Sequence, residues 1–99
     1  MLNINKTEDG GKLLYALEGR LDTITSPDLE KELMASIDGI SELVLDFAKL
    51  DYISSAGLRV LLAAYKATDG KAEMKVVNVN EIISDIFDTT GFSDILNIE

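Results

Sequence analysis

The sequence predicts an α/β fold: a small mixed sheet of four to five strands with about three to four helices packed against it. Two observations lead to this class. Short β-branched or apolar runs alternate along the chain with segments that have the apolar spacing of helices. The chain has 99 residues, 46% of them hydrophobic, which suits one core and is short for two. We therefore expect residues 1–99 to form a single domain.

A β-hairpin is expected at the start of the chain. Residues 2–5 alternate apolar and polar side chains, and residues 12–19 do so in part. The segment Asp9-Gly10-Gly11 between these runs is a turn signal. The first two strands are therefore predicted to be antiparallel neighbours.

A helix follows the second strand, and two starting points compete. Either Ser26 is the N-cap with Pro27 in the first helical position, or Thr25 is the N-cap with Asp28 three residues later. Gly39 is expected to end the helix. The spacing predicts one apolar stripe along it, formed by Leu29, Leu33, Ile37 and Ile40.

The middle of the chain predicts a buried strand, a short turn and a second helix in direct succession. The continuous apolar run 43–47 is typical of a central strand. Residues 51–58 lead from this strand into the helix, with Ser54 and Ser55 where the helix begins. The apolar stripe of this helix is predicted to contain Leu58, Leu61, Leu62 and Tyr65.

The last third of the chain predicts a strand, a helix and a short final strand. Residues 74–79 are rich in β-branched side chains. Asn80 is the expected N-cap of the following helix and Gly91 its expected end. Residues 92–98 are expected to supply the last strand, and right-handed crossovers should place the helices against the sheet.

Ser54 and Ser55 allow two interpretations. In the first, one of the two serines is an N-cap that stabilises the helix by about 1 kcal/mol and does nothing else. In the second, a helix N-terminus with unpaired N–H groups and a positive dipole end accepts a phosphoryl group on one of the hydroxyls. The small side chains of Ala56-Gly57 would leave room there for a kinase or a partner protein.

Asp22 also allows two interpretations. It follows the second strand and precedes three hydroxyl residues, so it can form or cap the turn. If the second and third strands are parallel, however, their carboxyl ends share one rim of the sheet, where open α/β sheets place their sites. Asp22 and Ser55 would then lie close together, which the structure can test.

Composition argues against several classes of function. The 18 acidic and 9 basic residues give a net charge of -9, which disfavours sequence-independent binding to nucleic acid. The chain lacks Cys and His, so thiolate and imidazole metal sites and Ser-His-Asp triads are excluded. No apolar stretch approaches a membrane span and the first residues do not resemble a signal peptide, so we expect a soluble, cytoplasmic protein without membrane insertion.

No catalytic or cofactor site is predicted. The glycines lack the spacing of phosphate-binding loops. Lys66 lies eleven residues after Ser55, about 16 Å along a helix, too far to activate that hydroxyl. The acidic pairs Glu8/Asp9, Glu30/Glu32 and Asp85/Asp88 are too dispersed for a metal cage. We therefore expect a protein that is not an enzyme and that needs neither metal nor cofactor.

Three segments resemble the successive signatures of one family. They are Gly19-Arg20-Leu21-Asp22, Leu50-Asp51-Tyr52-Ile53-Ser54-Ser55-Ala56-Gly57-Leu58-Arg59-Val60-Leu61 and Thr89-Thr90-Gly91-Phe92. In their order and spacing they resemble STAS-domain anti-sigma factor antagonists, and the resemblance covers nearly the whole chain. The chain differs from many members at three positions. Many of them have Asp at the position of Ser54, Ser or Thr at that of Ala56, and Gly at that of Arg59.

The resemblance implies a STAS fold and a switch in protein binding. A family member binds, when unphosphorylated, an anti-sigma factor that is also a serine kinase, and this frees a sigma factor. The kinase phosphorylates the antagonist, and a PP2C-type phosphatase reverses the modification. Alignment with the family places the phosphoacceptor at Ser55, with Ser54 as the alternative. The partner-binding residues it implies are Asp22, Thr23, Ser54, Ser55, Ala56, Gly57 and Leu58.

Other functions of this family stay open. STAS domains also act as subunits of lipid transporters or as signalling scaffolds, where phosphorylation is not required. The isolated chain is expected to be a monomer that faces a dimeric kinase. A small hydrolase using Ser55 ranks last, because no base lies within reach of that hydroxyl.

Overall fold

The computed structural model describes residues 2–99, and within this range its elements confirm the predicted fold class. The strands are β1 (Leu2–Asp9), β2 (Lys12–Leu21), β3 (Glu42–Ile53), β4 (Glu73–Val77) and β5 (Asn97–Ile98). The helices are α1 (Ser26–Ser36), α2 (Ser55–Thr68) and α3 (Glu81–Thr90), followed by one 3-10 turn, η1 (Phe92–Asp94).

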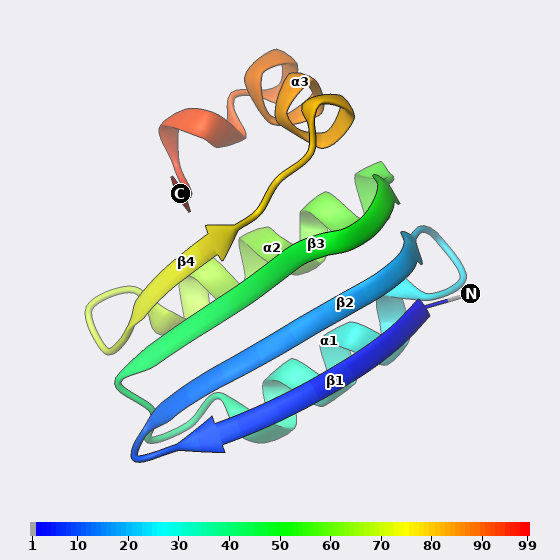
Figure 1. Cartoon of the computed structure of the whole chain (residues 1–99). Helices are drawn as coiled ribbons and strands as arrows, with labels where there is room; N and C mark the ends of the chain where they lie inside the picture. The colour runs from blue at the N-terminus through cyan, green and yellow to red at the C-terminus, as the bar shows by residue number, and fades with distance from the viewer. Residues whose placement is uncertain (1) are drawn as a thin grey trace.

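The five strands form one sheet in sequence order, β1-β2-β3-β4-β5 (Figure 1). β1 and β2 are antiparallel, as the hairpin signal predicts, and every later pair is parallel. The carboxyl ends of β2 and β3 therefore lie at the same rim of the sheet. Each of these strands is followed at that rim by a helix, so the starts of α1 and α2 are brought together.

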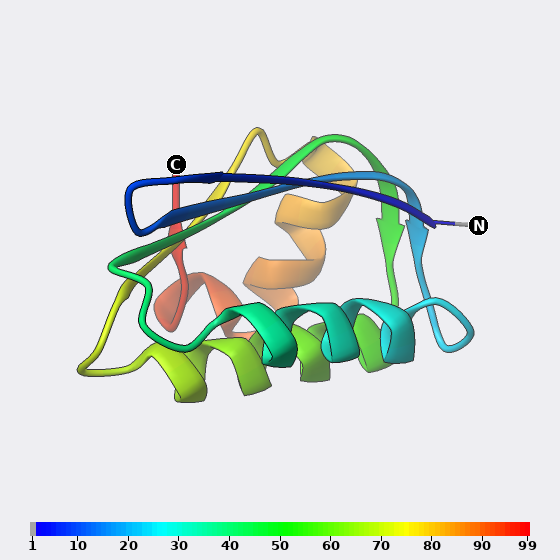
Figure 2. The ribbon, with the colours of Figure 1, turned by 90° about the horizontal axis from the view of Figure 1, so that it is seen from below.

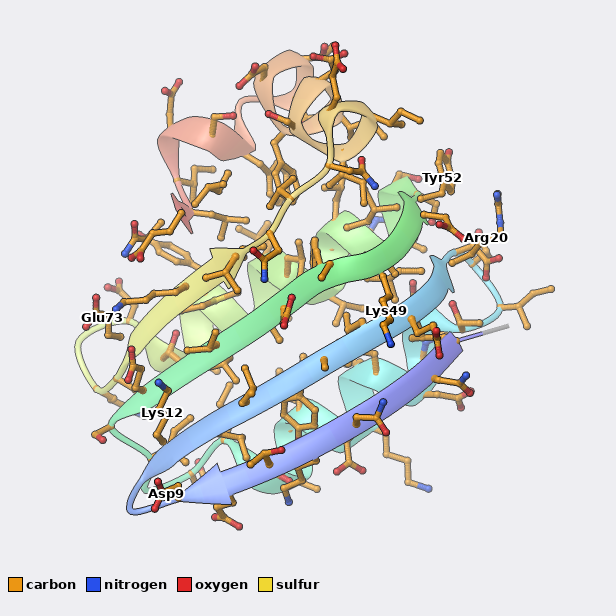
Figure 3. The ribbon with its side chains drawn as sticks, in the orientation of Figure 1. Asp9, Lys12, Arg20, Lys49, Tyr52 and Glu73 are labelled. Carbon is orange, nitrogen blue, oxygen red and sulfur yellow. The ribbon has the colours of Figure 1, made fainter. Side chains whose placement is uncertain are left out.

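The helices occupy one side of the sheet (Figure 2). α1 and α2 lie side by side beneath it, and α3 stands on the same side near β3 and β4. The opposite face of the sheet carries exposed polar side chains such as Lys49 (Figure 3). The core is therefore a single layer between sheet and helices.

Alternation along β3 shows how this core is built. Leu43, Leu45 and Phe47 are completely buried against the helices, whereas Asp46 and Ala48 face the other side. The largest buried side chains of the core are Tyr15, Phe47 and Phe87, with leucines and isoleucines from β2, β3, α1 and α2 around them.

β3 extends further than the sequence predicts. Residues 51–53, which we expected to form a turn, belong to the strand, and Ile53 pairs with Leu21 of β2. Register shifts in the β2–β3 pairing, between Ala16 and Glu18 and again between Gly19 and Arg20, place extra residues in β3. These shifts break the two-residue alternation, which is why the sequence pattern hides the end of the strand.

The ends of α1 also differ from the prediction. The helix begins at Ser26, so Thr25 occupies the N-cap position, but its hydroxyl makes no capping bond to the helix. The helix ends at Ser36 and not at Gly39, which lies in the following turn with φ +79°. The chain leaves the helix early because Ser41 must reach the amino end of β2, where its N–H donates to the Gly11 carbonyl at 2.8 Å.

The remaining boundaries follow from tertiary pairing. β1 continues past residue 5 to Asp9 because its whole length pairs with β2. β4 covers residues 73–77 rather than 74–79. Only residues 97–98 of the predicted last strand pair with β4, because residues 92–94 form η1. The expected cap of α3 is confirmed: the Asn80 side chain accepts a hydrogen bond from the Ile83 N–H at 2.9 Å.

Candidate functional site

The structure brings the predicted site residues together at the carboxyl ends of β2 and β3. Leu21 and Ile53 are neighbours across the two strands, and the Ser54 N–H donates to the Leu21 carbonyl at 2.9 Å. Asp22 follows Leu21 directly, and Ser55 follows Ser54. The prediction that Asp22 and Ser55 share one rim is therefore confirmed.

Ser54 and Ser55 have different environments. Ser54 is the N-cap of α2, in extended conformation, and its hydroxyl accepts a hydrogen bond from the Gly57 N–H at 3.4 Å. Ser55 is the first residue of the helix and is exposed. Within residues 2–99 its hydroxyl makes no hydrogen bond to another side chain or to the backbone. The cap therefore occupies one hydroxyl and leaves the other accessible.

Gly57 and Leu58 lie beneath this surface. A Cβ atom at Gly57 would lie 2.7 Å from Ile53 Cγ1 and 2.8 Å from Leu21 Cγ, so the helix start touches the strand ends there. Leu58 is buried in the core. These two predicted partner-binding residues thus position the first turn of α2, whereas Ser55 and the partly exposed Ala56 form its accessible surface.

Asp22 organises the turn between β2 and α1. One of its carboxylate oxygens accepts hydrogen bonds from the N–H groups of Ile24 at 3.0 Å and Thr25 at 3.1 Å, and from the Thr25 hydroxyl at 3.2 Å. The N–H of Thr25, followed by that of Ile24 and the Thr25 hydroxyl, lowers the pKa of the Asp22 carboxyl below its ordinary value. Asp22 is therefore an ionised acceptor that fixes the shape of this turn.

Arg20 braces the same rim. Its Nε lies 3.9 Å from the second oxygen of Asp22, and its guanidinium stacks over the Tyr52 ring, 4.6 Å from the ring centroid. Figure 3 shows the side chains of Arg20 and Tyr52 next to each other at the ends of β2 and β3. The cation thus ties Asp22 to β3 and is engaged at both contacts.

Ile24 is a site residue that the sequence analysis missed. It is 84% exposed, the highest value among the exposed large hydrophobic side chains, and lies at the tip of the turn that Asp22 holds. An isoleucine in the middle of the polar run Thr23-Ile24-Thr25-Ser26 was the available signal. Ile24 is thus an exposed apolar side chain that an ordered turn holds beside Asp22.

A groove of about 310 Å³ runs between the starts of α1 and α2. Thr23 lies at its α1 end, so the predicted site residues continue into it. Its lining residues are Thr23, Ser26, Pro27, Glu30, Ala56, Arg59 and Val60. Its walls combine small apolar side chains with the hydroxyls of Thr23 and Ser26 and with one acidic and one basic side chain, Glu30 and Arg59.

Residues 2–99 contain neither a candidate metal site nor a helix that could span a membrane. No three acidic side chains in this range gather in an arrangement that would hold a metal ion. None of the helices described here has the length and apolar character needed to cross a membrane.

Replacing Asp22 by asparagine is expected to lower stability at neutral pH, and the loss should disappear in acid. The folded-state pKa of Asp22 lies below that of the unfolded chain, so its ionised form stabilises the fold above about pH 4. This contribution is lost as the pH falls through the lowered folded-state pKa. Urea unfolding of both proteins between about pH 3 and pH 7 measures the difference. If the difference in free energy of unfolding between the wild type and Asp22→Asn stays constant down to about pH 3, the charge of Asp22 does not stabilise the fold.

The fold and this rim together define a small α/β domain of the STAS type. The chain belongs to the STAS domain family: the family model matches residues 3–99. A candidate anti-sigma factor antagonist of Bordetella bronchiseptica, BtrV, is 37% identical over 89% of this chain and 78% of its own length. The anti-sigma-B factor antagonist of Bacillus subtilis is 24% identical over 98% of this chain and 90% of its own length.

Solved structures show the same fold. The anti-sigma factor antagonist SpoIIAA in its unphosphorylated form superposes with a TM-score of 0.85 at 13% identity, covering 98% of this chain and 88% of SpoIIAA. The Bacillus SpoIIAA structure in the phosphorylated form gives a TM-score of 0.77 at the same 13% identity, covering 98% and 91%. At this identity the similarity concerns the fold alone.

Proposed function

We propose that this protein is an anti-sigma factor antagonist whose partner binding is switched by phosphorylation of Ser55. Unphosphorylated, it binds an anti-sigma factor that is also a serine kinase, and a sigma factor is released. The kinase phosphorylates Ser55, and a PP2C-type phosphatase removes the phosphoryl group. The observation that carries this proposal is the exposed Ser55 hydroxyl at the first position of α2. The neighbouring Ser54 is the N-cap, and its hydroxyl already accepts a hydrogen bond from the Gly57 N–H. Membership of the STAS family and the names of the relatives support it.

The position of Ser55 favours a switch that leaves the fold intact. A phosphoryl group adds about -1.5 to -2 charges at neutral pH. At the N-terminus of α2 that charge meets unpaired N–H groups and the positive end of the helix dipole. The match of this chain to both forms of SpoIIAA is consistent with a fold that accepts the modification. The phosphoryl group would then act at the partner interface, through its size and charge.

The proposed partner surface is the rim around Ser55. Thr23 and Ile24 are exposed there beside Asp22, and Ala56 lies next to Ser55 on α2. The chain carries a net charge of -9, so the surface of the anti-sigma factor should bear Lys or Arg side chains. Gly57 and Leu58 would act from below by holding α2 in place.

The same proposal describes a binding protein without catalysis of its own. A Ser55 nucleophile would need a base, and the chain has no histidine. We further propose that residues 1–99 work as a single STAS domain, as a monomer in the cytoplasm, without cofactor and without direct contact to nucleic acid. A role as a transporter subunit or scaffold would use the same fold without Ser55 phosphorylation.

Incubation with ATP and lysate of the source organism should add about 80 Da, the mass of one phosphoryl group, to the wild-type protein. We expect the addition to persist in Ser54→Ala and to vanish in Ser55→Ala, because Ser55 is the exposed hydroxyl of the pair. Intact-mass spectrometry of the three proteins measures this.

Each other outcome of the mass measurement decides something. Loss of the added mass only in Ser54→Ala would move the phosphoacceptor to Ser54. No added mass on the wild-type protein, in a lysate that phosphorylates other proteins, would contradict the switch and favour the transporter or scaffold role. Thermal melting of the two variants checks that both are folded.

A further inference from the structure

The exposed face of α2 places an arginine next to the proposed phosphoacceptor. α2 begins at Ser55, and Arg59 follows four residues later; both side chains are exposed. Residues four apart on a helix are surface neighbours, with about 5–6 Å between their Cβ atoms. An acidic group four residues before a basic one is also the favourable order for such a pair. A phosphoryl group on Ser55 would therefore lie within reach of the Arg59 guanidinium.

Arg59 has no other partner among residues 2–99. Its side chain takes part in none of the ion pairs, side-chain hydrogen bonds or cation–π contacts found in this range. The other arginine of the chain, Arg20, contacts both Asp22 and Tyr52. A guanidinium presents several N–H donors in a planar fork that matches phosphate oxygens. The Arg59 guanidinium is thus exposed to solvent and not engaged by another residue in this range.

A buried hydroxyl lies in the wall of the groove next to Arg59. Ser26 lines this groove together with Ala56 and Arg59, and Ser26 is only 2% exposed. Its hydroxyl is buried and has no hydrogen-bond partner within the described residues. Buried hydroxyls usually have such a partner, so Ser26 is a polar group beside Arg59 whose hydrogen bond the described residues leave unmade.

We propose that Arg59 holds the phosphoryl group of phosphorylated Ser55 within the same molecule. This inference rests on the proposed function, in which Ser55 is the residue modified. In the unphosphorylated protein Arg59 and the groove are available to the partner. In the phosphorylated protein the guanidinium turns to the phosphate at the edge of the groove. Phosphorylation thus changes the surface twice, by adding a group at Ser55 and by withdrawing the Arg59 cation from the partner.

The test uses the full chain with phosphoserine installed at position 55 by genetic encoding, so it needs no kinase. Melting temperatures are measured with and without the phosphoryl group in the wild type, in Arg59→Gln and in Lys66→Gln. Lys66 is the matched control, because it is exposed on the same helix and its loss removes the same charge about 11 Å beyond Arg59. Arg59→Lys tests whether the charge alone suffices.

The change in melting temperature on phosphorylation is expected to be about 2–4 °C more positive in the wild type than in Arg59→Gln. Lys66→Gln should behave like the wild type, and Arg59→Lys should fall between. A ³¹P NMR titration should also show a phosphate pKa about 0.3 units lower with Arg59 than with glutamine. Glu30, a carboxylate that lines the groove together with Arg59, is common to all variants.

An equal effect of phosphorylation in the wild type and in Arg59→Gln would overturn the inference. The inference would also be overturned if Lys66→Gln lost as much of the phosphorylation effect as Arg59→Gln, since the effect would then come from net charge. Both outcomes are separate from the proposed function, because the phosphoserine is present whether or not a kinase makes it. Failure of the mass measurement in lysate would contradict the natural switch and leave the coupling measurable.

Discussion

Replacing Gly57 by alanine is expected to lower the free energy of unfolding by about 2–3 kcal/mol. The added methyl group would lie 2.7 Å from Ile53 Cγ1 and 2.8 Å from Leu21 Cγ, closer than real Cβ atoms approach other heavy atoms. Leu21 and Ile53 are buried at the ends of β2 and β3, so they have little room to move. The helix preference of alanine over glycine, about 1 kcal/mol, is too small to offset this overlap.

Urea unfolding measures the effect, with Gly39→Ala as the control. Gly39 has no heavy atom within 4 Å of the added Cβ position, but its φ is +79°. Its substitution therefore costs only backbone strain, about 1–2 kcal/mol. If Gly57→Ala is as stable as the wild type, the first turn of α2 does not pack against the strand ends as described.

The same variant should also affect the candidate site. To relieve the overlap, the first turn of α2 must move away from the ends of β2 and β3. That movement displaces Ser55 from the rim at which β2 and β3 end. We therefore expect Gly57→Ala to slow phosphorylation of Ser55 as well as to destabilise the fold, even though Gly57 itself is buried.

Replacing Phe87 by alanine is expected to cost about 3–5 kcal/mol. Phe87 is completely buried, and its ring lies 6.4 Å from the ring centroids of both Phe47 and Phe92. It therefore joins α3 to β3 and to η1, and its loss leaves a cavity among large side chains. Since domains of this size are stable by only about 5–15 kcal/mol, much of the stability would be lost.

Thermal unfolding measures this loss, which should lower the melting temperature by more than about 12 °C. Ile82→Ala is the matched control on the same helix, because Ile82 is 61% exposed. Its substitution should change the free energy of unfolding by no more than about 0.5 kcal/mol. Equal effects of the two substitutions would show that α3 is not anchored through Phe87.

Several features of the fold were predicted correctly because their signals are local. Asn80 and Gly91 mark the two ends of α3, since a capping side chain and a left-handed residue act on adjacent N–H and C=O groups. The glycines at positions 10 and 11 mark the hairpin for the same reason. The rim shared by Asp22 and Ser55 followed from strand direction, which the order of elements implies.

Other features depend on contacts between segments far apart in the sequence. The end of β3 at Ile53 depends on pairing with Leu21, thirty-two residues earlier, and on register shifts that no local pattern shows. The early end of α1 depends on the bond between Ser41 and Gly11. From the residues alone, either Ser54 or Ser55 could be the N-cap of α2. Only the backbone geometry at the start of the helix assigns the cap to Ser54.

The sequence by itself determined the order of the elements, the α/β class, the family and the segment that carries the candidate site. These depend on composition, periodicity and short motifs, which act within one element. Only the tertiary structure decided that the Asp22 carboxylate is used inside its own turn, that Gly57 touches Leu21 and Ile53, and that Arg59 and Ser26 line one groove. The reason is physical: hydrogen-bond partners, close packing and grooves are made by distant segments that meet only when the sheet and helices assemble.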